Sequence, residues 1–467
     1  MPSTVAPEAP EGTWRSPLLI VAACLVLAAL SLLLPSTPTY DPWAWIIWGR
    51  EILHLDLVTT DGPSWKPLPA LFTVPFALFG GAAPWLWLIV ARAGALLGLV
   101  FAFRIARRLA GPFAGGAAAG ALVLSPWTFK NAALGNSEGL MAAAVLGAID
   151  RHLAGRYHQA FALGLGAALL RPEAWPFFGL YGLWLLWRER GRAALLVGGA
   201  FASLPVLWFG PELWGSGNLN RASDRAQQPN ADSAAFAADP AVEVLRKTMD
   251  MFTTPIGVGL VALLLVLLLR RPSLAGRGRL IGGLALISVA WLAIVAVMTA
   301  NGFSGNQRYL VMPVTILFVL GAVGLGAGLQ ELRRLPSGRL AGVLAASLAA
   351  LACSASYWGD VGNMLDSLEY QGVLQADLER SVEEAGGPEF LRACGPAATG
   401  AFLVPAVAWQ LDVHANRVGL ETQLPGVVFR VQTHPFSNAV PSVKPILGEP
   451  TTTFADRGNW RILGDCG

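Results

Sequence analysis

Residues 280–300, LIGGLALISVAWLAIVAVMTA, are the stretch of this chain that says most about its fold. The stretch contains no charged residue, and about 20 apolar residues suffice for a helix to cross the hydrocarbon core of a membrane. The whole chain of 467 residues shares this character, because 54% of it is hydrophobic and only 13% is charged. A typical globular domain is charged at about 25% of its positions. We therefore predict an α-helical integral membrane protein.

Further apolar runs lie on both sides of this stretch. Several are shorter than a spanning helix ideally requires, but they are rich in Gly and Ala, which allow helices to pack closely in a membrane. Together with residues 280–300 they predict about eleven transmembrane helices. The runs are Pro17–Leu34, Ala82–Phe103, Pro112–Trp127, Gly139–Ile149, His158–Leu170, Pro176–Trp187, Ala193–Phe209, Pro255–Leu269, Tyr309–Leu329 and Leu340–Trp358.

Arginine-rich connections give the orientation of these helices. Every second junction is short and basic, and such junctions face the cytoplasm by the positive-inside rule. Eleven spans with a cytoplasmic N-terminus place the C-terminus outside, so we expect a multi-pass cell-membrane protein with an extracytoplasmic tail. The basic junctions are Arg104–Arg108, Arg151–Arg156, Arg188–Arg192, Arg270–Arg279 and Arg333–Arg339.

The C-terminal tail differs in kind from the rest of the chain. It has mixed charge, a helical stretch near Met364–Glu384, and strand-like runs at Gly400–Trp409 and Val427–Gln432. We predict a cytoplasmic N-terminal tail over residues 1–16, a transmembrane domain over residues 17–357, and a small extracytoplasmic α/β domain over residues 358–467. Cys394 and Cys466 both lie in this last domain, where an oxidising compartment favours a disulfide between them. The alternative is two unpaired thiols.

Composition also excludes some classes of function. The net charge of +3 is too small to indicate a nucleic-acid surface, and the four cysteines and five histidines show no metal-ligand spacing. We therefore predict no nucleic-acid partner and no metal site, and no cofactor is certain.

The first outer loop begins with a candidate catalytic acid. Residues 39–51 read TYDPWAWIIWGRE, so Asp41 follows the first span directly and stands before a tryptophan-rich stretch suited to the membrane interface. Residues 64–69, SWKPLP, come next and open an apolar run to Phe79 that is too short to span, which predicts an interfacial or re-entrant helix. A single carboxylate at a helix end is more often a solvated loop residue, so Asp41 alone is weak evidence for a site.

Four further motifs are predicted to lie on the same outer side of the membrane. They are Ser125-Pro126, Asn136-Ser137-Glu138, Leu170-Arg171-Pro172-Glu173, and residues 307–313, QRYLVMP. In this order and topology, over most of residues 17–330, the chain resembles the GT-C superfamily of membrane glycosyltransferases. The resemblance is to the type represented by dolichyl-phosphate-mannose mannosyltransferases and the lipid A aminoarabinose transferase. It implies transfer of a sugar from a polyprenyl-phosphate donor. Many members carry two adjacent acids in the first loop, whereas Pro42 follows Asp41 here, which leaves the base and a divalent metal open.

Physical chemistry assigns roles to the charged residues of these motifs. A sugar hydroxyl is a poor nucleophile near neutral pH, so a carboxylate must act as general base, and we assign that role to Asp41. The lipid phosphate that leaves needs cations for its developing charge. Lys66, Arg171 and Arg308 are the candidates, since each lies at an outer helix end. The alternative for each is a cation that snorkels to the interface.

Four other residues are candidates for supporting or acceptor-binding roles. Arg92 lies inside an apolar run, where a charge is costly and usually functional. It could instead pair with Glu138 or Glu173, and both acids are also possible acceptor ligands. Tyr309, beside Arg308, completes the set.

The expected function is transfer of a sugar, with inversion, to a cell-envelope glycan, lipid or protein acceptor on the outer face of the membrane, in cell wall biogenesis. Two alternatives stay open. One is a transporter or flippase of a lipid-linked sugar, although the chain lacks the two similar halves that such proteins often show. The other is an inactive scaffold of an envelope-assembly complex.

Overall fold

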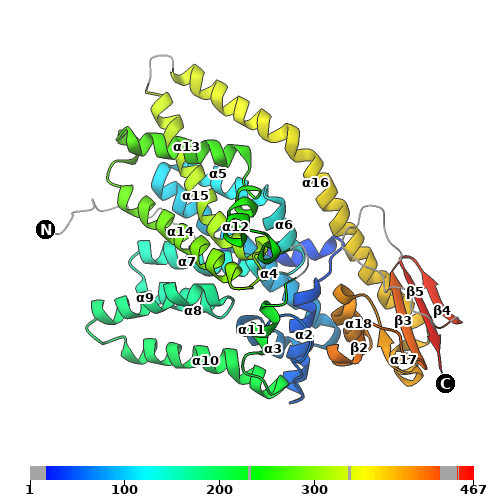
Figure 1. Cartoon of the computed structure of the whole chain (residues 1–467). Coiled ribbons are helices and arrows are strands. Elements are labelled where there is room, and N and C mark those ends of the chain that lie inside the picture. The colour runs from blue at the N-terminus through cyan, green and yellow to red at the C-terminus, as the bar shows by residue number, and fades with distance from the viewer. Residues whose placement is uncertain (1–16, 230–232, 335–337, 432–449, 451, 467) are drawn as a thin grey trace.

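A computed structural model describes residues 17–229, 233–334, 338–431, 450 and 452–466 of the chain. A bundle of helices fills most of the molecule, and a small sheet lies at one end of it (Figure 1). The predicted N-terminal tail, residues 1–16, lies outside the described residues. The bundle helices are α1 (Pro17–Leu30), α2 (Tyr40–Leu53), α3 (Pro67–Ala77), α4 (Ala83–Ala110), α5 (Pro112–Val123), α6 (Pro126–Ala133), α7 (Glu138–Leu153), α8 (Tyr157–Ala168), α9 (Trp175–Arg188), α10 (Ala194–Ser216), α11 (Arg221–Ala226), α12 (Pro240–Met249), α13 (Thr254–Leu268), α14 (Gly278–Ala300), α15 (Gln307–Leu332) and α16 (Gly338–Glu384).

Among the described residues, four helices are long and apolar enough to cross a membrane. Two bent pairs raise this number to six if each pair is one span: α6 with α7, at an angle of 112°, and α12 with α13, at 104°. The prediction of about eleven spans is therefore not confirmed. The reason is length: α8 has 12 residues and α9 has 14, so they reach only about 18 and 21 Å against a hydrocarbon core of about 30 Å.

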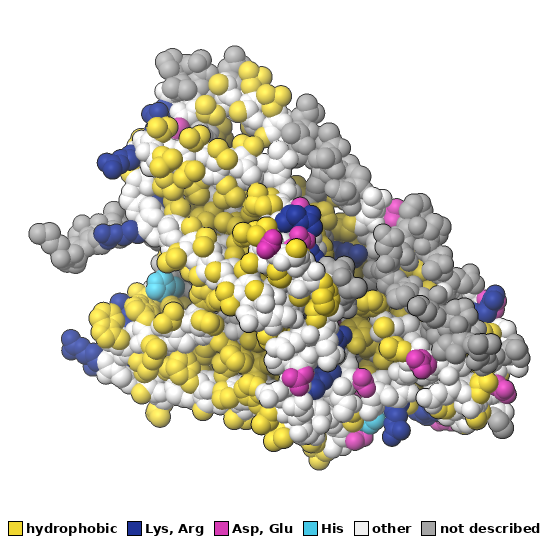
Figure 2. Space-filling view, in the orientation of Figure 1, with side chains coloured by type: hydrophobic (Ala, Val, Ile, Leu, Met, Phe, Trp, Pro, Cys, Tyr) yellow, Lys and Arg dark blue, Asp and Glu magenta, His cyan; other side chains and the backbone are white. Residues whose placement is uncertain are grey.

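The outer surface of the bundle is nonetheless apolar. Large hydrophobic side chains stand exposed on several helices, among them Leu195 on α10 at 92% and Leu286 on α14 at 69% exposure. Figure 2 shows such side chains gathered over the bundle, with few charges between them. Soluble proteins rarely expose apolar patches of this extent. The surface thus supports a multi-pass membrane protein.

The helix α15 forms the centre of the bundle and is buried along most of its length. It packs closely against α13 because glycines face each other: a Cβ atom at Gly259 or Gly324 would collide with the backbone of the partner helix. The prediction that Gly-rich runs serve close helix packing is correct at this contact.

The segment predicted as the first outer loop contains two helices, α2 and α3. The position of the tryptophan-rich helix α2 at the membrane interface stays a prediction, but its tryptophans face protein. Trp43, Trp45 and Trp48 are all less than 5% exposed, because α3 packs on one side of α2 and the C-terminal domain on the other. This helix is therefore part of the protein core.

The C-terminal part folds into a mixed sheet with the strand order β2-β1-β3-β5-β4. The first three strands are parallel, and β5 is antiparallel to both β3 and β4. The predicted α/β character is correct, as is the strand beginning near Val427. The elements are α17 (Gly387–Cys394), β1 (Ala397–Ala398), α18 (Val404–Gln410), β2 (Val418–Gly419), β3 (Gly426–Val431), β4 (Thr452–Arg457) and β5 (Trp460–Asp465).

The prediction of a strand at Gly400–Trp409 is wrong. This run forms a 3₁₀ turn followed by α18. Short apolar runs are ambiguous between the two structures because burial on all sides removes their periodicity. Pro405 decides the outcome, since it stands at the start of α18, where its ring is compatible with a helix.

The helix α16 joins the bundle to the sheet as one continuous element (Figure 1). The predicted domain boundary at residues 357/358 falls inside it, and the domain division stays a prediction. The C-terminal end of α16 holds the sheet, because Leu374 O accepts a hydrogen bond from Trp460 Nε1 at 2.8 Å and Asp377 accepts one from the Asn459 backbone amide at 3.1 Å.

Cys394, at the end of α17, is joined by a disulfide to Cys466, beyond β5. The bond closes a loop of 72 residues that contains the whole sheet. It fastens the last strand to the helical side of the domain.

We expect Cys466→Ser to lower the free energy of unfolding of this domain by about 2–5 kcal/mol, since the unfolded chain regains the freedom that the closed loop denied it. Calorimetry of the purified protein, with and without a reducing agent, measures the change. Cys24→Ser is the matched control, because Cys24 is a buried cysteine outside any disulfide. A C-terminal transition that neither Cys466→Ser nor reduction shifts would contradict the expectation.

Candidate active site

Asp41 lies in the first turn of α2, where a helix dipole favours an acidic side chain. The segment before it is attached to the turn between α6 and α7: the Thr39 amide donates to Leu134 O at 3.1 Å, and Thr39 Oγ1 donates to Asn136 Oδ1 at 3.2 Å. These bonds bring the start of α2 beside the start of α7, which carries Glu138.

Arg308, in the first turn of α15, connects the two acids. Its Nη1 atom lies 2.9 Å from Asp41 Oδ2, and its Nε atom lies 2.9 Å from Glu138 Oε1. Arg171 Nη2 binds the same Glu138 oxygen at 2.8 Å, and Arg171 Nη1 lies 3.7 Å from Glu173 Oε1. Glu138 and Glu173 are 3% and 2% exposed, so the arginines compensate acids that could not stay buried alone.

Lys66 and Tyr309 complete the arrangement. Lys66 Nζ donates to Ser137 Oγ at 3.1 Å and stands 5.0 Å from the centre of the Trp45 ring. Burial, together with the neighbouring Arg171 and Arg308, lowers the pKa of Lys66 to about 7. The ring of Tyr309 lies 4.8 Å from the Arg171 guanidinium, a cation–π contact.

The structure thus brings together six charged residues predicted from scattered motifs. We call them the charge cluster: three carboxylates and three cations, each at or beside the start of a helix. The members are Asp41, Lys66, Glu138, Arg171, Glu173 and Arg308.

Arg92 lies apart from the charge cluster. It donates to Ala133 O at 2.7 Å and to the hydroxyls of Ser31 and Ser36 at 2.8 and 2.9 Å. The suggested pairing with Glu138 or Glu173 is therefore not found. Instead, Arg92 ties the end of the first helix and the following loop to the end of α6, which supports the segment leading to Asp41.

The C-terminal domain holds α2 from the other side. Arg50 Nη1 lies 2.5 Å from Asp412 Oδ1, and the ring of His414 bridges Glu51 at 2.8 Å and Asp56 at 3.0 Å. Burial raises the pKa of Glu51, which the Val58 amide and His414 partly offset through hydrogen bonds. The helix that carries Asp41 is thus fixed at both ends.

A cavity of about 2060 Å³ opens at the charge cluster. Asp41 and Arg308 line one part of it, with Tyr40 and Asn136 beside them. The rest extends between α5, α13, α15 and α16 along apolar and small side chains. Drug-sized ligand sites usually measure about 300–1,000 Å³, so the cavity can hold a longer molecule with one polar end.

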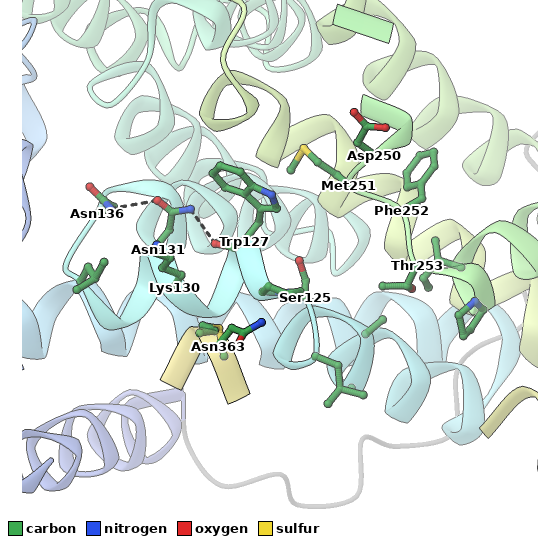
Figure 3. A pocket seen from close by; sticks show the side chains of 18 of the residues that line it. Ser125, Trp127, Lys130, Asn131, Asn136, Asp250, Met251, Phe252, Thr253 and Asn363 are labelled. Carbon is green, nitrogen blue, oxygen red and sulfur yellow. Dashed lines mark hydrogen bonds between the residues drawn. The ribbon is translucent and has the colours of Figure 1, made fainter. Parts of the chain in front are cut away.

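Only one of the three predicted phosphate-binding cations lines this cavity. Arg308 does so, whereas the half-buried Lys66 and the buried Arg171 do not line it. The sequence analysis missed Lys130 of α6, which lines the cavity and has no ion-pair partner within the described part of the chain (Figure 3). Its position in α6, directly after the Ser125-Pro126 motif, is the signal that could have identified it.

Comparisons with known proteins bear on the fold. No protein-family model matches the chain, and no curated protein matches it in sequence. Two crystal structures are similar: ArnT from Cupriavidus metallidurans bound to undecaprenyl phosphate, and the same protein in the apo state. Each has a TM-score of 0.57 and 15% sequence identity, over 96% of this chain and 97% of that one. The chain therefore shares the fold of this ArnT.

Proposed function

We propose that this protein is a membrane glycosyltransferase that transfers a sugar from a polyprenyl-phosphate donor to an acceptor on the outer face of the membrane. The observation that carries the proposal is the meeting of Asp41 and Arg308, 2.9 Å apart, at the polar end of a long apolar cavity. The reaction requires a base for the acceptor hydroxyl and a cation for the leaving phosphate, and both kinds of group stand at this end of the cavity.

The cavity suits a donor with an isoprenoid chain and a phosphate. Its apolar part is bounded by residues such as Phe113 and Ala117 of α5 and Val258 of α13, and apolar surface favours a hydrocarbon chain. Arg308 and Lys130 supply positive charge at the other part. The similar structure of C. metallidurans ArnT is bound to undecaprenyl phosphate, which supports this class of donor.

The chemistry follows from the two groups. The acceptor hydroxyl oxygen attacks the anomeric carbon, and Asp41 takes the hydroxyl proton as the new C–O bond forms. The bond between that carbon and the donor phosphate breaks, and its electron pair leaves with the phosphate oxygen, whose charge Arg308 and Lys130 stabilise. Attack opposite the leaving group inverts the configuration at the carbon.

We further propose that the C-terminal domain lies outside the cytoplasm, since disulfides persist in oxidising compartments and Cys394 and Cys466 are joined. The acceptor would then be a glycan, lipid or protein of the cell envelope.

The test is a transfer assay. The purified full-length protein, in lipid nanodiscs, receives a radiolabelled polyprenyl-phosphate sugar and a cell-envelope extract, and label is followed into the extract. Transfer with inversion supports the proposal. Movement of the lipid-linked sugar across vesicle membranes without transfer would instead establish the transporter, and the absence of both would leave the scaffold.

We expect the apparent affinity for the donor to fall as the pH rises through about 7. Lys66, whose pKa is about 7, is charged below that pH and neutral above it. The charge cluster is then balanced at low pH and carries one excess negative charge at high pH, which repels an anionic donor. The kcat/KM for the donor should fall by about tenfold between pH 6 and pH 8.

Lys66→Arg is the control, because an arginine stays charged throughout this range. The variant should lose most of the pH dependence while it keeps transfer activity. An identical pH profile in both proteins would show that Lys66 is not the titrating group.

A further inference from the structure

The wall of the cavity that α16 supplies changes character along the helix. In the part next to α5 and α13 the lining positions are small and apolar, from Gly342 to Ala350. Nearer the C-terminal domain, four uncharged polar residues line the cavity, each four positions after the last, so they follow one face of the helix. We call them the polar face of α16: Asn363, Ser367, Gln371 and Gln375.

The polar face has hydrogen-bonding capacity that the protein does not use. Among the described residues, the side chains of Asn363, Ser367 and Gln371 have no hydrogen-bond partner. Gln375 is buried and donates only to Glu379 Oε1, at 3.3 Å. Asn363 is exposed, whereas Ser367 and Gln371 are half-buried. Partly buried polar groups are costly unless something satisfies them, and all four residues line a cavity.

A close contact places the polar face of α16 beside residues 35–41, the segment that ends at Asp41. Gly372, between Gln371 and Leu374, packs so tightly that a Cβ atom would stand 2.8 Å from backbone atoms of Pro35 and Ser36. The residues that follow, from Thr37 to Asp41, also line the cavity. This part of α16 is therefore next to the segment that leads to Asp41.

Other groups around this part of the cavity suit a sugar. Figure 3 shows Asn363 beside α6, whose Lys130 and Asn131 line the same cavity. The rings of Tyr40 and Phe402, with centres 6.2 Å apart, both line the cavity. They offer apolar surface to the C–H groups of a sugar ring, while the amides can bind its hydroxyls.

The charge here does not favour an acidic ligand. Asp366, Glu369 and Glu379 lie on the same segment of α16 but do not line the cavity. The charged side chains that line the cavity are two acids, Asp41 and Asp250, and two cations, Lys130 and Arg308, so their charges cancel. No excess of cations remains for an anionic polymer.

We infer that the polar face of α16 is the acceptor subsite and that the acceptor is an uncharged glycan. This inference rests on the proposed transferase function and adds the class of acceptor to it. The glycan lies along Asn363, Ser367, Gln371 and Gln375, with its terminal hydroxyl at Asp41.

The experiment separates acceptor binding from donor binding. Oligosaccharides released from the cell envelope are divided into a neutral and an acidic fraction, and lipid-linked material forms a third. Each is offered to the full-length protein in nanodiscs with a saturating lipid-linked donor. The variants are Asn363→Ala and Gln371→Ala, and the control is Glu369→Ala, an exposed position on the same segment of α16 that does not line the cavity.

Wild-type protein should use the neutral fraction. Asn363→Ala and Gln371→Ala should each raise KM for that acceptor by about tenfold, the loss of one or two hydrogen bonds, with KM for the donor and the melting temperature unchanged. Transfer only to the acidic or lipid-linked fraction, or unchanged acceptor KM in both variants, would overturn the acceptor assignment and leave the transferase intact. A wild-type protein that transfers to no fraction would overturn both.

Discussion

Asp41→Asn is expected to lower sugar transfer by about 10²-fold or more, because the amide keeps the size of the side chain and cannot accept the acceptor's proton. Donor binding should survive and could tighten. In the structure, Arg308 Nη1 is held by the Asp41 carboxylate at 2.9 Å, and the substitution frees this cation for the donor phosphate. The expected signature is a fall in kcat without a rise in the donor KM.

Asp61→Asn is the matched control. Asp61 lies exposed between α2 and α3, outside the charge cluster, so its loss should leave transfer within about twofold of wild type. Protection of each protein against thermal unfolding by a polyprenyl phosphate reports donor binding separately. Full transferase activity in Asp41→Asn would remove this residue as the base and favour the transporter or scaffold.

The residues of the charge cluster could be found from the sequence because each one stands at the outer end of an apolar run. Helix ends on one side of a membrane lie at one level, so motifs far apart in the chain can converge there. Glu138 and Arg308, 170 positions apart, illustrate this, with Nε and Oε1 atoms 2.9 Å apart.

Which of the charged residues face the cavity could not be predicted in the same way. Topology places Lys66 and Lys130 on one side of the membrane but does not say which faces the cavity. Packing decides it: Lys66 stands against Trp45 and Ser137, whereas the α6 helix turns Lys130 into the cavity. Side-chain direction depends on the rotation of each helix, which loose motifs do not encode.

Helix number was the least predictable feature of the fold. An apolar run can be buried in the protein core or face lipid, and both environments favour the same apolar residues. The run Gly400–Trp409 belongs to the core of the C-terminal domain, while α8 and α9 are apolar yet too short to span as single straight helices. Composition alone does not separate these cases.

Arg308→Met is expected to abolish measurable transfer and also to destabilise the protein. The substitution keeps an unbranched, flexible side chain without the guanidinium, and it leaves Glu138 with one arginine in place of two and Asp41 with none. Breaking a buried ion pair from one side costs about 3–5 kcal/mol. The loss of activity alone would therefore not tell a functional cation from a structural one.

The double variant Arg308→Met/Glu138→Gln separates the two roles. It removes one positive and one negative charge, so the charge cluster stays balanced, and much of the stability lost in Arg308→Met should return. Transfer should not return, because the cavity still lacks its cation beside Asp41. Lys130→Ala is the comparison, since it removes a cavity cation that has no ion-pair partner among the described residues. It should raise the donor KM about tenfold with an unchanged melting temperature. Recovery of transfer together with stability in the double variant would mean that Arg308 serves only to neutralise Glu138, and the donor phosphate would then have to bind elsewhere in the cavity.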